Sequence, residues 1–177
     1  MSVAPLRGAA GEVHARDLPI PAGPGASAVQ VEVEGAAMVL GSRQSGGLVD
    51  ATACARDGVE VVRRRSGGGA VWLAPGEHVW VDVLLGRADP RWHDDVAVAC
   101  GWVGDAWCAA VAAEGLAAAG DLTVHRGGLT RAAPICFDAM GPGEVALGGA
   151  KLVGVSQRRT REGARFQDRK STRLNSS

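Results

Sequence analysis

Residues 61–71 read VVRRRSGGGAV, and this stretch says more about the fold than any other part of the chain. Residues 59–62 are rich in valine, which predicts a strand that leads into three arginines and then Gly67, Gly68 and Gly69. Glycine backbones can approach a ligand closely, and consecutive N–H groups in a turn can form an anion-binding nest beside bidentate guanidinium donors. The segment therefore suits a phosphate, an acyl-adenylate or a carboxylate. The alternative interpretation is a flexible hairpin turn beside a solvated basic run.

A second glycine-rich stretch, GGAKLVGVSQRR, occupies residues 148–159. Gly148-Gly149 predicts the turn of a hairpin between strands at 144–147 and 151–157. The chain has only two lysines, Lys151 and Lys170, among 19 basic residues. A compact ammonium is not interchangeable with a guanidinium, so Lys151 is a candidate catalytic group. Positions 149 and 150 hold Gly and Ala where a phosphate-binding P-loop needs Lys and Ser or Thr, which excludes that motif.

Composition limits the class of protein. The 177 residues are enough for one domain, and a hydrophobic content of 46% excludes a disordered chain. The 19 basic and 19 acidic residues give no basic field for nucleic acid, and no apolar run approaches the length of a membrane span. The first residues lack the apolar core of a signal peptide, and the four cysteines show no C-x-x-C spacing. We expect a cytoplasmic protein with reduced thiols.

The order of the predicted elements indicates the fold class. Predicted strands cluster before and after one helical region at 93–119, which Gly101 and Gly104 are expected to divide. This favours an α+β fold with a mixed, largely antiparallel central sheet flanked by helices. Residues 1–27 are rich in Pro and Gly and are expected to have little regular structure. Residues 164–167 are expected to begin a last strand that ends there.

Together the two glycine-rich motifs resemble the catalytic domain of lipoate–protein ligases and their biotin-ligase and octanoyltransferase relatives. The segments VLGSRQ (39–44), ICFDAM (135–140) and EGARFQ (162–167) follow in the family's order, so the resemblance covers residues 25–167. It implies a fold of the biotin/lipoate protein ligase catalytic-domain type. Trp72 and Leu73 stand where the family often has an aromatic residue and a histidine, and Val155-Ser156-Gln157 replaces its S-A-Q. These departures leave the identity of the acyl group open.

The resemblance implies a ligase that uses ATP with Mg²⁺ to activate lipoate, or a similar acyl acid, as an acyl-adenylate. The acyl group would then pass to a lysine of a lipoyl-acceptor protein domain, with a separate accessory domain as a further partner and with no nucleic acid or membrane. Lys151 would contact the reacting carbonyl and phosphate. The residues that would bind the acyl-adenylate are Arg63, Arg64, Ser66, Gly67, Gly68, Gly69, Ala70, Val71, Gly149, Gly154 and Gln157.

Two other functions remain open at this stage. Cys136 lies 15 residues before Lys151, where some octanoyltransferases of this family form a thioester, so it is an alternative nucleophile. A non-catalytic relative that only binds an acyl group or a nucleotide is the second alternative. No metal ligand set is predicted: the four histidines lack metal-site spacing, and Asp82 is expected to be a buried acid that the backbone satisfies rather than a metal contact.

Residues 168–177, DRKSTRLNSS, differ from the rest of the chain because they contain neither Gly nor Ala. The string resembles one reading frame of a common sequencing adapter. We therefore interpret residues 1–167 as a single acyl-ligase catalytic domain and residues 168–177 as a non-native tail, and we expect the natural chain to continue beyond Gln167. The alternative is a genuine polar tail.

Overall fold

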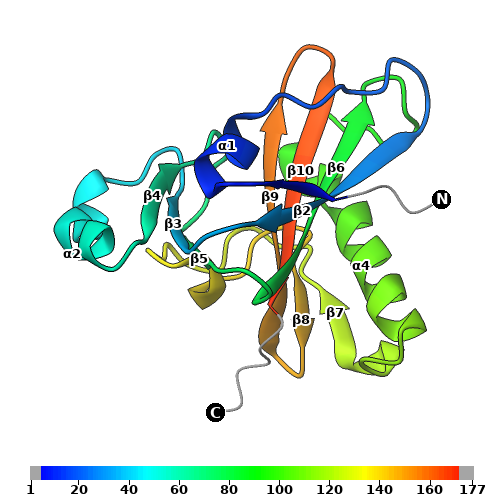
Figure 1. Cartoon of the computed structure of the whole chain (residues 1–177). Helices are drawn as coiled ribbons and strands as arrows, with labels where there is room; N and C mark the ends of the chain where they lie inside the picture. The colour runs from blue at the N-terminus through cyan, green and yellow to red at the C-terminus, as the bar shows by residue number, and fades with distance from the viewer. Residues whose placement is uncertain (1–4, 172–177) are drawn as a thin grey trace.

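Two β-sheets form the framework of the computed structural model, which describes residues 5–171 (Figure 1). The larger sheet contains, in spatial order, β1 (Leu6–Gly8), β2 (Ala26–Val33), β6 (His78–Gly86), β10 (Gly163–Ser171), β9 (Ala150–Arg159), β8 (Val145–Leu147) and β7 (Leu122–Val124). The smaller sheet contains β4 (Glu60–Arg63), β3 (Ala37–Leu40) and β5 (Val71–Leu73). The pairs β1–β2 and β3–β4 are parallel and the remaining neighbours are antiparallel. The expected mixed, largely antiparallel α+β architecture is confirmed.

Helices are few and short around these sheets. They are α1 (Ala10–Ala15), α2 (Ala51–Arg56), α3 (Val96–Ala99) and α4 (Gly101–Ala113), with 3-10 turns η1 (Gly46–Leu48), η2 (Ala119–Asp121) and η3 (Cys136–Asp138). The predicted helical region divides at Cys100, after an N-terminal cap in which Asp95 accepts hydrogen bonds from the N–H groups of Ala97 and Val98. Figure 1 shows α4 beside the larger sheet and α2 beside the smaller one.

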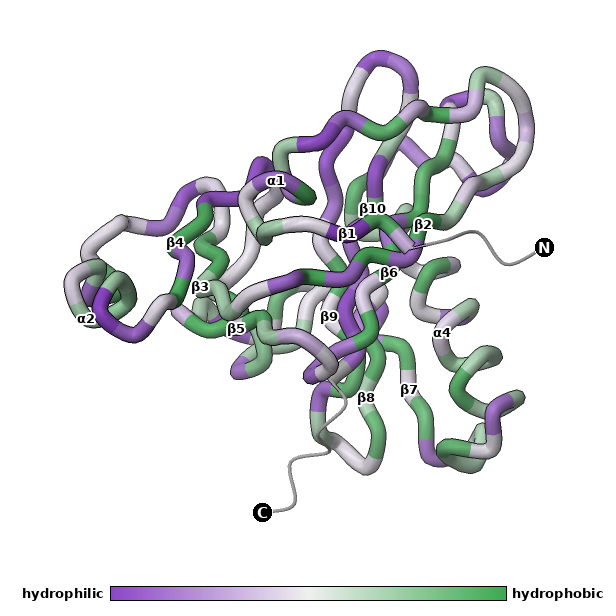
Figure 2. The backbone as a smooth tube through the Cα atoms, viewed as in Figure 1, coloured by the Kyte–Doolittle hydropathy of each residue, from purple (hydrophilic) through white to green (hydrophobic). Residues whose placement is uncertain are grey.

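The α3–α4 region is more apolar than the sequence analysis expected. Val96–Ala113 has a mean hydropathy of 1.6 over 18 residues, long and apolar enough by composition to cross a membrane. Core helices pass the same test, and Val103 and Val111 are buried in the clusters that α4 forms with the sheet. Figure 2 shows hydrophobic residues along α4 and along β8 beside it. A third of this window is buried, and Val96 and Val98 of α3 are each 55% exposed.

Alternation along β6 explains how the larger sheet buries both faces. Trp80 packs in the core cluster that contains residues of α1 and the smaller sheet, while Val81 and Val83 line a cavity beside α4. Successive side chains of a strand point to opposite faces, so one apolar strand supports two layers. The core is consequently divided into three clusters instead of one.

The expectation for residues 1–27 was wrong. This segment contains β1 and α1, in spite of its Pro and Gly content. Leu6–Gly8 pairs in parallel with residues 31–33 of β2, and Ala10 and Val13 of α1 are buried in the first core cluster. A strand of three residues is too short to show the alternation of apolar and polar residues that predicts strands, so β1 is recognised only from its pairing with β2.

The last strand is also longer than expected. β10 continues past Gln167 to Ser171 and pairs with β6 and β9 over that length. Asp168 is fully buried on the α4 face, where one carboxylate oxygen accepts a long hydrogen bond of 3.4 Å from the indole of Trp107 and the other has no partner. Burial raises the pKa of Asp168 well above its usual range. The non-native origin of residues 168–177, of which 172–177 lie outside the described residues, stays a prediction.

The buried carboxyl of Asp168 should lower the stability of the fold. Asp168→Val should raise the free energy of unfolding by about 1–3 kcal/mol because it removes a poorly paired polar group from an apolar surround. Because the pKa is raised in the folded state, the wild type is penalised increasingly as pH rises above about 3.9, the unfolded value. Urea unfolding at pH 5 and pH 8 should therefore show a larger gain for the variant at pH 8.

The same replacement at the exposed Asp121 is the control and should change stability by less than about 0.5 kcal/mol. A gain from Asp168→Val that shrinks between pH 5 and pH 8 would contradict the assignment of a raised pKa.

Candidate active site

The glycine-rich loop between β4 and β5 is braced from within by an arginine. The Arg64 guanidinium is buried and donates hydrogen bonds to the carbonyl of Gly67 at 3.1 and 2.8 Å and to the carbonyl of Gly69 at 2.8 Å. Gly68 has a φ of +99°, which a residue with a side chain rarely adopts. Hydrogen bonds from a buried arginine thus hold the loop carbonyls, which favours an ordered loop over the flexible turn beside a solvated basic run of the alternative interpretation.

Close backbone approach fixes the loop against the segment around η3. A Cβ atom added to Gly69 would lie 2.6 Å from the Cys136 nitrogen and 2.7 Å from the Ile135 carbonyl carbon. Ala70 and Ile135 form a parallel bridge, in which Ala70 N–H donates to Pro134 O at 2.7 Å and Cys136 N–H donates to Ala70 O at 2.9 Å. Two segments more than sixty residues apart thus share one backbone interface.

Lys151 reaches the other side of this interface. Its side chain is only 3% exposed, and its ammonium donates hydrogen bonds to the carbonyls of Cys136 at 2.7 Å and Ala139 at 3.0 Å. A third contact, of 2.6 Å, joins the ammonium to the carboxylate of Glu144, which is equally buried. Cys136, which packs on the Gly-rich loop, therefore also accepts a hydrogen bond from Lys151 through its backbone carbonyl.

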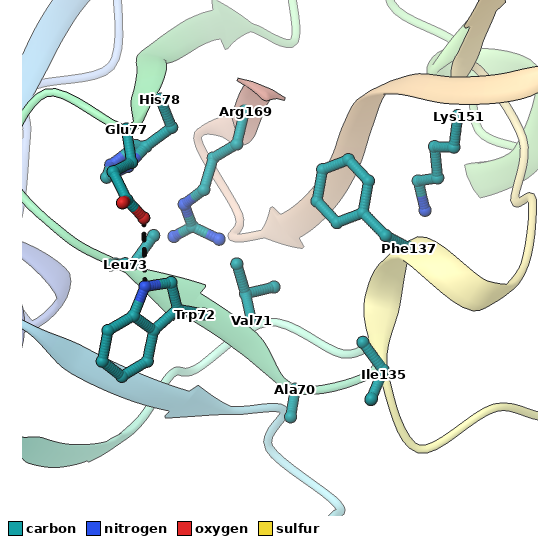
Figure 3. A pocket seen from close by; sticks show the side chains of 10 residues that line it. All are labelled: Ala70, Val71, Trp72, Leu73, Glu77, His78, Ile135, Phe137, Lys151 and Arg169. Carbon is teal, nitrogen blue, oxygen red and sulfur yellow. Dashed lines mark hydrogen bonds between the residues drawn. The ribbon is translucent and has the colours of Figure 1, made fainter. Parts of the chain in front are cut away.

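A cavity of about 400 Å³ lies where these segments meet (Figure 3). This volume is within the range of small-molecule sites. Figure 3 shows Lys151 and Phe137 at one side of the cavity and Trp72, Glu77, His78 and Arg169 at the other, with Val71 between them. The Trp72 indole donates a hydrogen bond of 3.2 Å to Glu77. The cavity thus has a cation at each side, Lys151 and Arg169, with apolar side chains such as Val71 and Phe137 between them, an arrangement that suits an anionic ligand with an apolar part.

Most of the predicted binding residues lie around the Gly-rich loop or the cavity. Ser66 is buried and its hydroxyl contacts that of Ser156 at 3.0 Å, which ties the loop to β9. Gly154 lies beside the lysine, because a Cβ added there would be 3.3 Å from Lys151 Cε and 3.6 Å from Cys136 Sγ. The predicted binding residues that the structure gathers around the loop or cavity are Arg64, Ser66, Gly67, Gly68, Gly69, Ala70, Val71 and Gly154.

Three predicted residues are not brought to the cavity. Arg63 donates to the carbonyls of Gly41 and Gln44 and so supports the loop from outside. Gly149 lies in the exposed β8–β9 turn with a φ of +85° and no atom within 4 Å of an added Cβ. Gln157 follows Ser156 in β9 and so projects from the opposite face of the strand.

Burial shifts the pKa values of the titratable groups behind the cavity, with nearby arginines in second place for the two histidines. Burial, with Arg169, Arg64 and Arg165 nearby, lowers the pKa of His14 to about 2, so this imidazole is neutral. Burial lowers the pKa of His78, in the cavity wall, to about 4. Burial also lowers the pKa of Arg64 from its usual value. Positive charge is therefore concentrated beside the cavity, as an anionic ligand would require.

The structure gives no support for a metal held by the protein alone. Within residues 5–171, no group of three or more His, Cys, Asp or Glu side chains could hold a metal ion. Asp82 is fully buried and accepts hydrogen bonds from Arg165 at 2.5 and 3.1 Å and from the Trp80 indole at 3.0 Å. It is a structural acid, as expected, although its partners are side chains.

The model of the lipoyl protein ligase A/B catalytic domain matches residues 29–167. The chain belongs to this family. No curated protein sequence is similar enough to this chain to match it. The family resemblance inferred from the two glycine-rich motifs is confirmed.

Solved structures share the fold of this lipoyl protein ligase A/B domain. A putative lipoate protein ligase from T. acidophilum with bound lipoic acid has a TM-score of 0.63 at 16% identity, over 84% of this chain and 56% of its own. Lipoate-protein ligase A bound with ATP gives 0.63 at 17%, over 88% and 57%. P. falciparum LipL1 in complex with lipoate gives 0.59 at 12%, over 86% and 37%. The chain thus spans roughly a third to three fifths of the length of these proteins.

Sequence reasoning missed several side chains of the ligase-domain site. His78, Phe137 and Arg169 line the cavity, and Glu144 holds the lysine. Glu144 could have been found, since the hairpin that pairs Ala146 with Lys151 places an acid two residues from the lysine's strand partner. Arg169 falls within the suspected tail, and His78 belongs to no motif.

The stability cost of replacing single glycines should show whether a glycine is required by close packing or only by the flexibility of the loop. Gly69→Ala should lower the free energy of unfolding by about 1–3 kcal/mol or more, because its methyl group would meet the backbone of Ile135 and Cys136. Gly67→Ala is the matched control, since nothing lies within 4 Å of its added Cβ, and should change stability by less than about 1 kcal/mol. Urea unfolding measures both. Equal costs at the two positions would contradict the packing described.

Proposed function

We propose that this chain is the catalytic domain of an ATP-dependent lipoate–protein ligase. It activates lipoate, or a similar acyl acid, as the acyl-adenylate and transfers the acyl group to a lysine of an acceptor protein. The observation that carries the proposal is the convergence of Lys151 and the Gly67–Gly69 loop on opposite sides of the Ile135–Cys136 backbone, beside one cavity. The solved relatives bound to lipoic acid and to ATP support these two ligands.

The chemistry of adenylation fits the charges of the site. Joining a carboxylate to ATP brings two anions together, and negative charge develops on the α-phosphate and then on the carbonyl oxygen in transfer. A fixed ammonium and ordered backbone N–H groups stabilise such charge more in the transition state than in the ground state. Lys151 supplies the ammonium, and the loop braced by Arg64 supplies backbone groups that need no reorganisation.

Among the described residues, no group of three or more His, Cys, Asp or Glu side chains could hold Mg²⁺. Mg²⁺ commonly binds through substrate phosphates with few protein ligands, so the ion would arrive with ATP. We therefore assign no residue and no reaction step to it.

Partner and location are part of the same proposal. One structural relative is a bipartite archaeal ligase described together with its E2 lipoyl domain, with a TM-score of 0.52 at 16% identity. This supports a lipoyl domain as the acceptor and a separate accessory domain as a second partner. A cytoplasmic location is supported by the need for ATP and by the four free cysteines of the described chain.

Pyrophosphate exchange tests the proposal directly. The protein should exchange labelled pyrophosphate into ATP only when lipoate is present, and Lys151→Ala should lower the rate at least about 100-fold because it removes the cation at the reacting phosphate. Lys170→Ala replaces the chain's other lysine and should retain the wild-type rate. Absence of exchange with lipoate, octanoate and biotin alike would reject the ligase assignment.

An octanoyltransferase that uses Cys136 is the second candidate. The observation in its favour is a distance of 3.6 Å between the Cys136 thiol and the Lys151 ammonium, since a neighbouring cation activates a thiol nucleophile. In that reaction the thiolate attacks the octanoyl thioester of a carrier protein, and the carrier thiol leaves.

Incubation with octanoyl carrier protein separates the two candidates. A ligase should show no octanoyl mass increment on the protein, and Cys136→Ala should retain at least about half of the lipoate-dependent exchange, because its sulfur takes no part in adenylation. A stable octanoyl adduct that Cys136→Ala abolishes would instead favour the transferase.

A further inference from the structure

Every hydrogen-bond donor of Lys151 is already occupied by the protein. An ammonium has three N–H donors, and the three oxygen acceptors within 3.0 Å of the nitrogen are those of Glu144, Cys136 and Ala139. A ligand that gains a hydrogen bond from Lys151 must therefore replace one of these partners. The question is which partner stays.

Glu144 is the most firmly held of the three. Its Oε2 accepts a hydrogen bond of 2.6 Å from the Gly141 N–H, and its Oε1 accepts one of 3.3 Å from the Val155 N–H. Its own carbonyl accepts from His125 N–H at 2.8 Å. The preceding Gly143 packs so tightly on Cys100, at the start of α4, that an added Cβ would lie 2.3 Å from the Cys100 carbonyl oxygen. The carboxylate is thus fixed from both sides.

The two carbonyl partners are uncharged groups at a single 3-10 turn. Cys136 is the first residue of η3 and Ala139 follows its last residue, and no side-chain hydrogen bond caps the start of this 3-10 turn of three residues. Ile135, next to Cys136, is 52% exposed. Because a hydrogen bond to an uncharged carbonyl is weaker than one to a carboxylate, an anionic ligand replaces these two partners more readily than it replaces Glu144.

The charged and titratable groups around Lys151 are a carboxylate, a thiol and two arginines. Glu144 faces the ammonium from the segment before β8, and the Cys136 thiol faces it from η3. Arg169 of β10 lines the same cavity, and Arg64 of the loop interacts electrostatically with both Cys136 and Glu144. The Phe137 ring lies 5.3 Å from the ammonium nitrogen. The carboxylate of Glu144 is the nearest counter-charge in direct contact with the lysine.

We propose that Glu144 is the positioning residue of this site. Its carboxylate keeps the buried Lys151 ammonium charged and in place, and the carbonyls of Cys136 and Ala139 are the partners that a bound acyl-adenylate replaces. This inference rests on the proposed function for its ligand, while the role of Glu144 toward Lys151 is independent of it. Without the carboxylate, burial and the neighbouring arginines would favour the neutral amine, which cannot stabilise a developing anion.

The chain's two lysines make a direct measurement simple. Protein labelled with ¹⁵N at lysine Nζ gives one signal for Lys151 and one for Lys170. In Glu144→Gln the midpoint of the Lys151 titration should fall by about one pH unit or more relative to the wild type, while the Lys170 signal serves as the internal reference. The high-pH limb of lipoate-dependent pyrophosphate exchange should move down by the same amount. A purely structural role would not move either midpoint.

Two further variants complete the test. Glu144→Asp keeps the charge on a shorter side chain, so the Lys151 midpoint should stay within about half a pH unit while kcat for exchange falls about tenfold and the KM for ATP stays within about twofold. Asp105→Asn, which removes an exposed carboxylate paired with Arg126 at 2.6 Å, should leave both readouts unchanged.

The outcomes distinguish the possible failures. An unchanged Lys151 midpoint in folded Glu144→Gln would overturn the proposal, and so would wild-type kcat in Glu144→Asp, which decides the matter if Glu144→Gln does not fold. A shifted midpoint in a protein whose wild type shows no exchange would support the role of Glu144 toward the lysine and reject the proposed ligase function.

Discussion

The site depends on one close contact between two backbones. Gly69 lies against Ile135 and Cys136 at a distance that leaves no room for a Cβ atom, and the Ala70–Ile135 bridge hydrogen-bonds the two segments together. Because the carbonyl of Cys136 also accepts a hydrogen bond from Lys151, this contact couples the Gly-rich loop to the catalytic candidate on β9. The smaller sheet and the β8–β9 hairpin are thereby held as one site, although their loops are far apart in the chain.

A layer of buried polar groups lies between the two sheets and behind the cavity. It joins Asp82 to Arg165, Ser66 to Ser156 and Gln167, and Arg169 to His14. Burying such groups costs free energy unless they are paired, so the layer is a specific arrangement rather than a source of net stability. Its surplus of arginine over carboxylate leaves positive charge beside the cavity, which suits an anionic ligand. Structural polar groups thus also shape the electrostatics of the proposed reaction.

Much of the fold could be predicted from local patterns. The strand around 59–62 and the 144–157 hairpin follow from composition and turn residues. The division of the helical region near Gly101 and the antiparallel character of the sheet follow from turn residues and the order of elements. The segment at 1–27 could not, because β1 has only three residues and is defined by its pairing with β2. The extension of β10 to Ser171 likewise depends on β6 and β9, which offer hydrogen-bonding partners on both sides.

The sequence by itself determined the chemical groups of the site: three consecutive glycines, the arginines before them and a lysine presented from a glycine-rich hairpin. Residue type and spacing are enough for this, because backbone freedom and side-chain charge are local properties. Only the tertiary structure decided what those groups touch. It turned Arg64 inward to brace the loop, sent Gln157 to the opposite face of β9 and placed Glu144 against Lys151. Such contacts depend on strand register and on the close packing of remote backbones, which no local pattern contains.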